Sequence, residues 1–309
     1  MSTPHGPMLV IANPRSGDGR GTALAELRRV LEQDAVEHTL VITRRAGQAV
    51  ELTRDGIEAG ARFVVAVGGD GTVHEVVNGM VDAASGVPRA QDLVLGAVPG
   101  GSGSDFLRSF GLDVPVARLV RRHLLTDTTM PLDLGRVHHL DERGGARVRL
   151  FANIAECGWG ADVVATANRL PRRIGSARYL TAILLRTARL RARETTLRLA
   201  HTELTEPLTE VVVANGQFFG SGIKVAPRAL TDDGILNVQA WRGGRRELLA
   251  NLPRARVGEH LSDPSVREWQ SPTVEVDAPR PLRVEADGEV LGTTPARFDV
   301  LEHVLRLSI

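Results

Sequence analysis

Residues 63–79 read FVVAVGGDGTVHEVVNG, and this stretch decides the fold class. Its first five residues are apolar and end at Gly68 and Gly69, after which valines return at helical spacing. An apolar strand that runs through a glycine-rich turn into a helix is typical of parallel α/β sheets. Consecutive glycines let backbone N–H groups approach an anion, and the start of a helix adds donors, so the turn suits phosphate. A tight strand-to-helix turn without a ligand is the alternative.

The alternation of strands and helices extends on both sides of this stretch. Apolar periodicity predicts strands at 8–14, 38–44, 61–71 and 92–101, and helices at 23–33, 47–60 and 72–83. Four strands alternating with helices predict a doubly wound, mostly parallel sheet whose loops gather at the carboxyl ends of the strands.

The pattern changes near residue 135 to short alternating segments separated by glycine and proline, which predicts an all-β sandwich. We therefore expect an α/β domain over 1–134 and a β-sandwich domain over 135–309. A helical insertion is expected near 170–193, and a second short helix at 244–258.

The composition is that of a soluble globular protein, with 309 residues, 42% hydrophobic and 24% charged residues and a net charge of +1. These values exclude a disordered or collagen-like chain. The single cysteine, Cys157, excludes an internal disulfide and fits a reducing cytosol. Without a secretion signal or a run of roughly 20 apolar residues, we expect a cytoplasmic protein with peripheral membrane contact at most. A near-zero net charge and few aromatic residues argue against a nucleic-acid partner.

Two further glycine-containing loops follow expected strands. Residues 13–17, NPRSG, follow the first strand, and residues 99–106, PGGSGSDF, follow the fourth. Together with residues 68–72 they would form a crevice lined by backbone donors at one edge of the sheet. The loops lack the lysine of GxxxxGK[ST], and the first lacks GxGxxG spacing, so an ordinary Walker or dinucleotide site is not expected.

Seven motifs, in this order, resemble the diacylglycerol kinase catalytic-domain family, in particular bacterial soluble lipid kinases related to sphingosine kinases and NAD kinases. They are NPRSG, Thr43 with the following AGQA, GGDGTVHEVVNG, PGGSGSDFLRSFG, FANIAECGWGADVV, NGQFFGSGIKVAPRALTDDG and ADGE. The resemblance covers nearly the whole chain. It implies a kinase that transfers the γ-phosphoryl group of ATP to the hydroxyl of a membrane lipid in a cleft between the two domains.

The resemblance favours diacylglycerol as the acceptor, giving phosphatidic acid. A sphingoid-base or other lipid-alcohol kinase, a NAD kinase and a catalytically silent lipid-binding protein are the alternatives. The GSGSDF and ADGE motifs favour a lipid kinase over a NAD kinase.

The resemblance also implies site residues. The nucleotide contacts would be Asn13, Pro14, Arg15, Ser16, Gly17, Thr43, Gly69, Asp70, Gly71, Thr72, Val73, His74, Glu75, Ser102 and Asp105. A structural Mg²⁺ would be held by the backbone carbonyls of Leu230 and Ile235 and the carboxylate of Asp233, although this TDDG segment also suits a simple turn.

The ADGE motif supplies the expected catalytic group. Asp287 would be the general base for the lipid hydroxyl, and Glu289 would orient it or share its role. Asp70 is the rival base. From the residues alone, Asp287 and Gly288 between two strand-like runs also predict a hairpin turn.

The chain departs from the family pattern at several positions. Ser102 and Ser104 stand where threonine and asparagine are common, so amide contacts to a nucleotide are lost while hydroxyl contacts remain. Asp18 occupies a position that is often lysine, which leaves phosphate charge to nearby arginines. Arg228 replaces a residue that is usually acidic near the expected metal site.

The segment from Arg169 to Arg193 carries eight arginines and no acidic residue. At ~100° per residue, one helix face would carry Arg178, Arg186, Arg189 and Arg193, and the roughly opposite face Leu180, Ile183, Leu184 and Leu190. Such a helix suits an anionic membrane surface, and a merely solvated charged face is an equally weighted alternative. We expect a lipid substrate at the inner face of the membrane, and a homodimer stays open.

Overall fold

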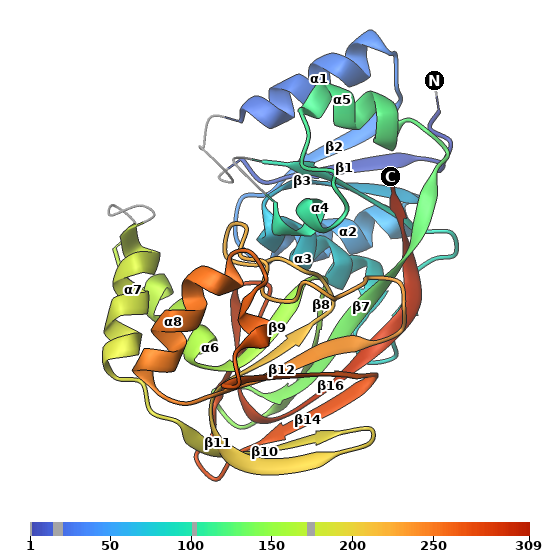
Figure 1. Cartoon of the computed structure of the whole chain (residues 1–309). Helices are drawn as coiled ribbons and strands as arrows, with labels where there is room; N and C mark the ends of the chain where they lie inside the picture. Colours follow the sequence, from blue (N-terminus) through green and yellow to red (C-terminus); the bar gives the residue numbers. More distant parts are fainter. Residues whose placement is uncertain (1, 15–20, 101–103, 172–176) are drawn as a thin grey trace. The chain divides into compact units, whose positions relative to one another are not determined.

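The computed structural model describes residues 2–14, 21–100, 104–171 and 177–309 (Figure 1). The chain divides into two compact units. Unit 1 comprises Met1–Leu134, Thr231–Asp233 and Leu301–Ile309. Unit 2 comprises Gly135–Leu230 and Gly234–Val300.

Unit 1 is built on a parallel sheet. Its strands are β1 (Met8–Ala12), β2 (His38–Ile42), β3 (Phe63–Gly68) and β6 (Val94–Pro99), in the order β2-β1-β3-β6. Every residue of β1, β3 and β6 is buried, as expected for parallel strands with helices on both faces. This confirms the predicted doubly wound sheet.

The helices of unit 1 form two layers. They are α1 (Thr22–Gln33), α2 (Gln48–Glu58), α3 (Asp70–Met80), α4 (Asp105–Ser109), α5 (Val116–Leu119) and the π-helix η1 (Val120–Leu124). Helix α2 packs on α3, and α1 packs on α5 on the other face of the sheet (Figure 1). The sequence did not predict α4, α5 and η1, which are too short to show a helical period. The chain leaves α3 at Met80 and forms the small hairpin of β4 (Val81–Asp82) and β5 (Val87–Pro88).

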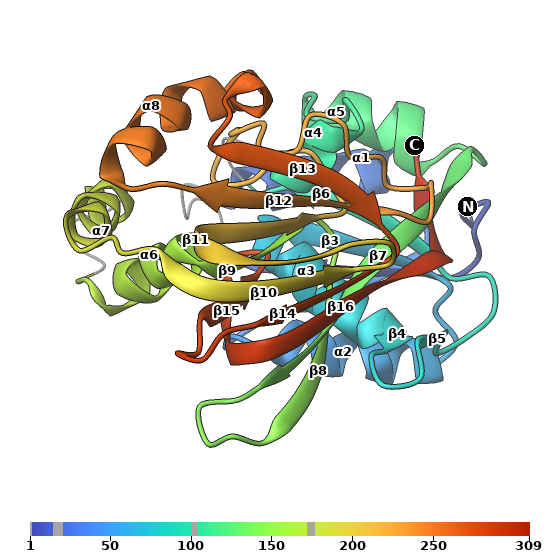
Figure 2. The same ribbon diagram turned by 60° about the horizontal axis from the view of Figure 1, so that its bottom comes forward.

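Unit 2 is antiparallel and sandwich-like (Figure 2). Its strands are β7 (Thr129–Leu140), β8 (Ala146–Phe151), β9 (Ile154–Gly158), β10 (Arg193–Leu199), β11 (Glu203–Ala214), β12 (Leu236–Arg242), β13 (Val266–Ser271), β14 (Thr273–Asp277), β15 (Arg283–Ala286) and β16 (Glu289–Ser308), of which β7 begins and β16 ends in unit 1. Alternate residues such as Val211, Val284 and Phe298 fill one core. The predicted β-sandwich class is confirmed.

The helical part of unit 2 differs from the sequence prediction. Instead of one helix that reaches Arg193, the chain forms α6 (Trp159–Arg169) and α7 (Ala177–Ala188), and Arg193 begins β10. Helix α6 packs on both α7 and the strands, so α7 is an outer helix that buries only Ala182 and Thr187. Leu180 and Leu184, which the sequence placed roughly opposite the arginines, are exposed. Helix α8 (Arg245–Ala255) and the 3-10 turn η3 (His260–Ser262) follow β12.

Strand β16 is longer than the sequence pattern predicted. The pattern of short alternating segments predicted two separate strands in this part of the chain, but the residues form one strand of 20 residues. Its last part pairs with β6 in parallel, with Arg306 opposite Val94 and Leu307 opposite Leu95. This pairing adds a strand to the unit 1 sheet from the far end of the chain.

Candidate functional site

The three glycine-containing loops of unit 1 start side by side. In the parallel register Ala12 lies opposite Val67, and Gly68 lies opposite Pro99. The Asn13 N–H donates to the Val67 carbonyl over 2.9 Å, and the Gly100 N–H donates to the Gly68 carbonyl over 2.8 Å. The structure thus brings the carboxyl ends of β1, β3 and β6 together, as the sequence predicted. Four of the expected nucleotide contacts, Arg15, Ser16, Gly17 and Ser102, lie outside the described residues.

Asp70 ties the second loop to the third. Its carboxylate accepts hydrogen bonds from the Ser104 hydroxyl (3.0 Å) and from the N–H groups of Asp105 (3.1 Å) and Phe106 (2.9 Å). These N–H groups belong to the first turn of α4, where a carboxylate satisfies unpaired donors and complements the helix dipole. Asp70 therefore acts as the cap of a helix 34 residues further along the chain.

Glu75 has the same kind of role at the start of α2. Its carboxylate accepts hydrogen bonds from the N–H groups of Gly47 (2.8 Å) and Ala49 (2.9 Å). Both N–H groups belong to the AGQA segment that follows Thr43. Thr43 itself is buried, and its N–H donates to the Ala12 carbonyl over 2.9 Å. The two acids of the glycine-rich motif thus fix the neighbouring loops.

The turn after β3 combines tight packing with open space. A Cβ atom added to Gly68 would overlap the Thr72 side chain, whereas a Cβ atom on Gly69 or Gly71 would meet no atom of the described residues within 4 Å. The side chains of Thr72, Val73 and His74 are buried. A nucleotide phosphate at this turn would therefore meet the backbone of Gly69 and Gly71 rather than these three side chains.

Asp105 lies at the same edge of the sheet. It is buried, and its carboxylate pairs with Arg108 over 2.8 Å. Arg108 also contacts Asp113 over 3.2 Å. The pair of Asp105 and Arg108 thus lies within the short helix α4.

Asp287 of unit 2 lies in a hairpin turn between β15 and β16. Asp287 and Gly288 both have positive φ angles, 49° and 85°, which suit the type I′ turns favoured by an Asp-Gly pair. The Asp287 carboxylate accepts hydrogen bonds from three successive N–H groups, those of Ala152 (2.8 Å), Asn153 (2.9 Å) and Ile154 (3.2 Å). The predicted hairpin is present, and its carboxylate has a fixed position. Glu289, half-buried, starts β16 on the other side of the turn.

Two asparagines that sequence reasoning did not single out build the surroundings of Asp287. The Asn215 side chain donates to the Ala152 carbonyl over 2.9 Å, and its own N–H donates to the Asn153 carbonyl over 2.8 Å. The Asn153 side-chain oxygen is buried and has no hydrogen-bond partner in the described part of the chain. Their signal was present, because each asparagine directly follows an apolar strand within a motif of the resemblance.

The expected metal ligands lie in the segment between β11 and β12. Leu230 is exposed, Asp233 and Ile235 are partly buried, and Gly234 between them has a φ of 68°. The carbonyls of Thr231 and Asp232 already accept hydrogen bonds from Asp133 and His303. The hydrogen bond to the Asp232 carbonyl raises the pKa of His303. Among the described residues, no cluster of three or more His, Cys, Asp or Glu side chains could hold a metal ion.

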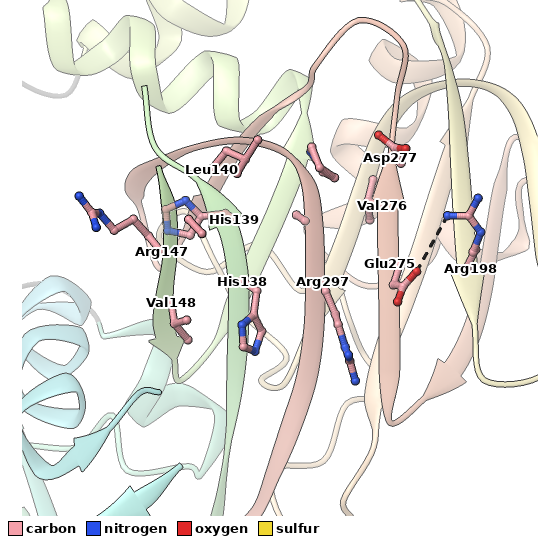
Figure 3. Close-up of a pocket in the computed structure, with 13 residues that line it drawn as sticks. His138, His139, Leu140, Arg147, Val148, Arg198, Glu275, Val276, Asp277 and Arg297 are labelled. Carbon is pink, nitrogen blue, oxygen red and sulfur yellow. Dashed lines mark ion pairs between the residues drawn. The ribbon is translucent and has the colours of Figure 1, made fainter. Parts of the chain in front are cut away.

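A hollow of about 330 Å³ lies elsewhere, on strands β7, β8, β10, β14 and β16 of unit 2 (Figure 3). None of the predicted site residues lines it. Its Arg198 is within 3.9 Å of Glu275 and 3.3 Å of Glu203, so its charge is compensated. We assign this hollow no role in the reaction.

The comparisons with known proteins agree with the two-unit architecture. Residues 7–137 match the family described as "Diacylglycerol kinase catalytic domain", and residues 153–309 match "YegS C-terminal NAD kinase beta sandwich-like domain". The chain belongs to the YegS and diacylglycerol kinase family of lipid kinases. The resemblance seen in the motifs is therefore confirmed.

Named relatives of this lipid kinase cover nearly its whole length. A "Diacylglycerol kinase" of Mycobacterium tuberculosis is 29% identical over 98% of this chain and 94% of its own. A "Probable lipid kinase YegS-like" of Pseudomonas fluorescens is 30% identical, with the same coverage of 98% and 94%. A crystal structure of a diacylglycerol kinase from Bacillus anthracis has a TM-score of 0.71 at 17% identity, covering 98% of this chain and 96% of that one, and supports the fold alone. The described part of the lipid kinase contains no helix that could span a membrane.

Proposed function

We propose that this lipid kinase transfers the γ-phosphoryl group of ATP to the hydroxyl of diacylglycerol. The observation that carries the proposal is the Asp287 carboxylate, which three backbone N–H groups hold at one position. A carboxylate that needs no reorganisation can act as a general base. Asp70 stays the rival base, and its carboxylate also accepts three hydrogen bonds, which hold the first turn of α4.

In the proposed step, Asp287 accepts the proton of the lipid hydroxyl while the hydroxyl oxygen bonds to the γ-phosphorus of ATP. The bond from that phosphorus to the β,γ-bridging oxygen breaks, and ADP leaves. The backbone of Gly69 and Gly71 would receive the phosphates. The functional domains, 1–134 for ATP and 135–309 for the lipid, are part of this proposal.

Mg²⁺ belongs to the proposal as well. The segment of Leu230, Asp233 and Ile235 offers two carbonyls and a carboxylate, and hard oxygen donors of this kind suit Mg²⁺. The ion would hold the turn around Gly234.

Attachment to an anionic membrane surface is supported by the outer face of α7. Its Leu180 and Leu184 are each 61% exposed, and Tyr179 and Leu185 are also exposed. Arg178 packs over the Tyr179 ring, 5.4 Å from its centre. Exposed leucines beside arginines suit insertion at a negatively charged lipid surface, and the proposal includes attachment at the inner face of the membrane.

The test is phosphate transfer from radiolabelled ATP to a panel of lipids in mixed micelles, with diacylglycerol, sphingosine, ceramide and phosphatidylglycerol offered separately. Labelled phosphatidic acid as the main product is the expected result. If label enters another lipid and not diacylglycerol, the acceptor is that lipid instead. Absence of label from every lipid, in a protein that binds ATP, would contradict the whole proposal.

A further inference from the structure

Three glutamates lie buried on one face of three adjacent strands in unit 2. Glu156 on β9, Glu210 on β11 and Glu285 on β15 are each no more than 4% exposed. Glu156 is directly opposite Glu285, whereas its direct partner on β11 is Val212, so Glu210 is a diagonal neighbour. Helix α6 packs over these strands. Sequence analysis did not single out this cluster.

Two of these glutamates are placed to share a proton. The carboxyl groups of Glu156 and Glu285 lie within hydrogen-bonding reach of each other on adjacent strands, and two carboxyl groups can form such a bond only if one of them is protonated. Burial favours the neutral form: it raises the pKa of Glu156 to about 7 and that of Glu285 well above its usual range. Glu210 is held separately, by the N–H of Gly160 in the first turn of α6.

The pair is surrounded mainly by acidic groups. Asp287 faces it from the hairpin turn and adds negative charge, and Glu210 faces it from β11 with a pKa that burial raises well above its usual range. Asp162 on α6 is partly compensated by Arg283, 3.2 Å away. The Cys157 thiol lies on the other side of β9, in the apolar core, and burial raises its pKa. Loss of the shared proton would therefore leave two adjacent buried negative charges.

The same pair is connected to the Asp287 turn. An oxygen of Glu285 accepts a hydrogen bond from the Gly288 N–H over 2.8 Å. A neutral carboxylic acid can donate from one oxygen to Glu156 and accept with the other from Gly288. The other strand of the pair, β9, begins at Ile154, which donates its N–H to the Asp287 carboxylate and accepts the Asp287 N–H over 2.9 Å.

We propose that Glu156 and Glu285 are positioning residues whose shared proton keeps the Asp287 turn in its catalytic geometry. The inference rests on the proposed role of Asp287 as general base. Neither glutamate touches the reacting atoms. They act by holding β15 and its turn against β9, and turnover falls when their proton is lost.

The experiment measures kcat and the KM for ATP between about pH 6 and pH 9 in the wild type and in glutamine variants. A glutamine at position 285 can donate to Glu156 and accept from Gly288 at every pH. The wild-type kcat should fall above about pH 7, by up to tenfold per pH unit, with an unchanged KM for ATP. Glu285→Gln and Glu156→Gln should keep kcat at high pH and lose this alkaline fall.

Two further variants separate positioning from general packing. Glu285→Leu introduces an apolar side chain of similar size and removes the contact with Gly288. This variant should lower kcat at least tenfold at every pH. Glu210→Gln changes the third buried carboxyl, which does not contact the turn, and should retain the alkaline fall, with a midpoint that moves because Glu210 and Glu156 interact electrostatically. The unfolding temperature of each variant shows whether it is folded.

Each contrary result identifies what is wrong. A flat wild-type profile, or an unchanged alkaline fall in both folded glutamine variants, overturns the positioning role. Loss of the alkaline fall in Glu210→Gln as well would assign the effect to the whole buried cluster and would also overturn the role of the pair. If Asp287→Asn retains wild-type turnover, the proposed base is wrong, and this outcome does not depend on the glutamine variants.

Discussion

At the scale of single residues, the glycine-rich motif has two properties, and only one of them could be predicted from the sequence. The open backbone at Gly69 and Gly71 could be expected from the glycines themselves. The capping roles of Asp70 and Glu75 could not, because their partners are 34 and 28 residues away in the chain. Only the register of the parallel strands brings those loops together.

Gly71 gives a direct test of phosphate binding at this turn. Because an added Cβ atom would meet nothing within 4 Å in the part of the chain that the structure describes, Gly71→Val should leave the unfolding temperature nearly unchanged. Its side chain would occupy the space where a phosphate approaches the backbone, so the KM for ATP should rise about tenfold or more. Gly68→Val is the contrasting variant and should fail to fold properly, because Thr72 fills that space. ATP affinity equal to wild type in folded Gly71→Val would place the phosphates elsewhere.

Asp287 and Asp70 can be distinguished by the same substitution. Asp287→Asn removes proton acceptance and should lower kcat by about 10²- to 10⁴-fold, with ATP binding nearly intact. Asp70→Asn turns an NH₂ group toward N–H donors of α4, so it should lower both stability and ATP affinity. Steady-state kinetics with ATP-binding titrations measure both effects. Near-normal turnover of Asp287→Asn, together with an inactive Asp70→Asn that still binds ATP, would reverse the roles.

At the scale of elements, strand and helix periods predicted the regular parts of both units. They failed where an element is short, as in α4 and α5, or where a tertiary contact decides, as in α6, whereas α7 lies within the predicted helical insertion. The residues of α6 are mostly small, and the strand before it ends only at Gly158, so no clear boundary signalled a helix. Which face of α7 is buried depends on α6, and the sequence of α7 does not contain that information.

The buried pair that joins β9 and β15 predicts an unusual pH dependence of stability. The folded-state pKa of Glu156, about 7, is above the ordinary 4.5, so the folded protein holds more protons than the unfolded chain between these values. The contribution of this proton to the free energy of unfolding is fully present below about pH 4.5. It is lost as the pH rises through about 7, and the loss is on the order of a few kcal/mol. Thermal unfolding should show a smaller loss over this window in Glu156→Gln. An identical slope in wild type and variant would contradict the buried proton.

Helix α7 predicts a membrane contact that depends on apolar residues. Leu180→Gln with Leu184→Gln should weaken binding to anionic vesicles several-fold without loss of thermal stability, since both side chains are exposed. Val87→Gln, which changes a 59% exposed apolar residue of unit 1, is the matched control. Arginine variants are less specific here, because the Arg186 side chain donates to Thr166 over 2.6 Å. Vesicle co-sedimentation that is the same for both proteins would reject α7 as the contact.

At the scale of the whole molecule, the sequence predicted the two fold classes but not how the chain is shared between the units. The β-rich pattern continues through the last residues, so nothing in it separates Leu301–Ile309 from the preceding strand. Their membership of unit 1 follows from a parallel pairing with β6, which is more than 200 residues away. Long-range pairings of this kind have no local sequence signal.

A substitution of Leu307 tests whether the end of β16 stabilises the sheet of unit 1. It is fully buried and lies opposite Leu95, so Leu307→Ala should destabilise unit 1 by about 2–5 kcal/mol. ATP binding should weaken when the protein is heated, although the mutation is in the last three residues of the chain. Val304→Ala, at a half-buried position of the same strand, should cost less. Chemical denaturation followed by nucleotide binding measures both, and equal effects of the two variants would contradict the pairing.

The shared strand β16 also has a consequence for synthesis. The ribosome makes the polypeptide from its amino end, so residues 1–134 emerge first and await the residues that complete their sheet. Until residues 301–309 appear, β6 has an unpaired edge along Val94 and Leu95, and such edges are prone to association between chains. The edge of β6 thus needs protection during the whole synthesis of unit 2, which lies between the two parts of unit 1 in the order of translation.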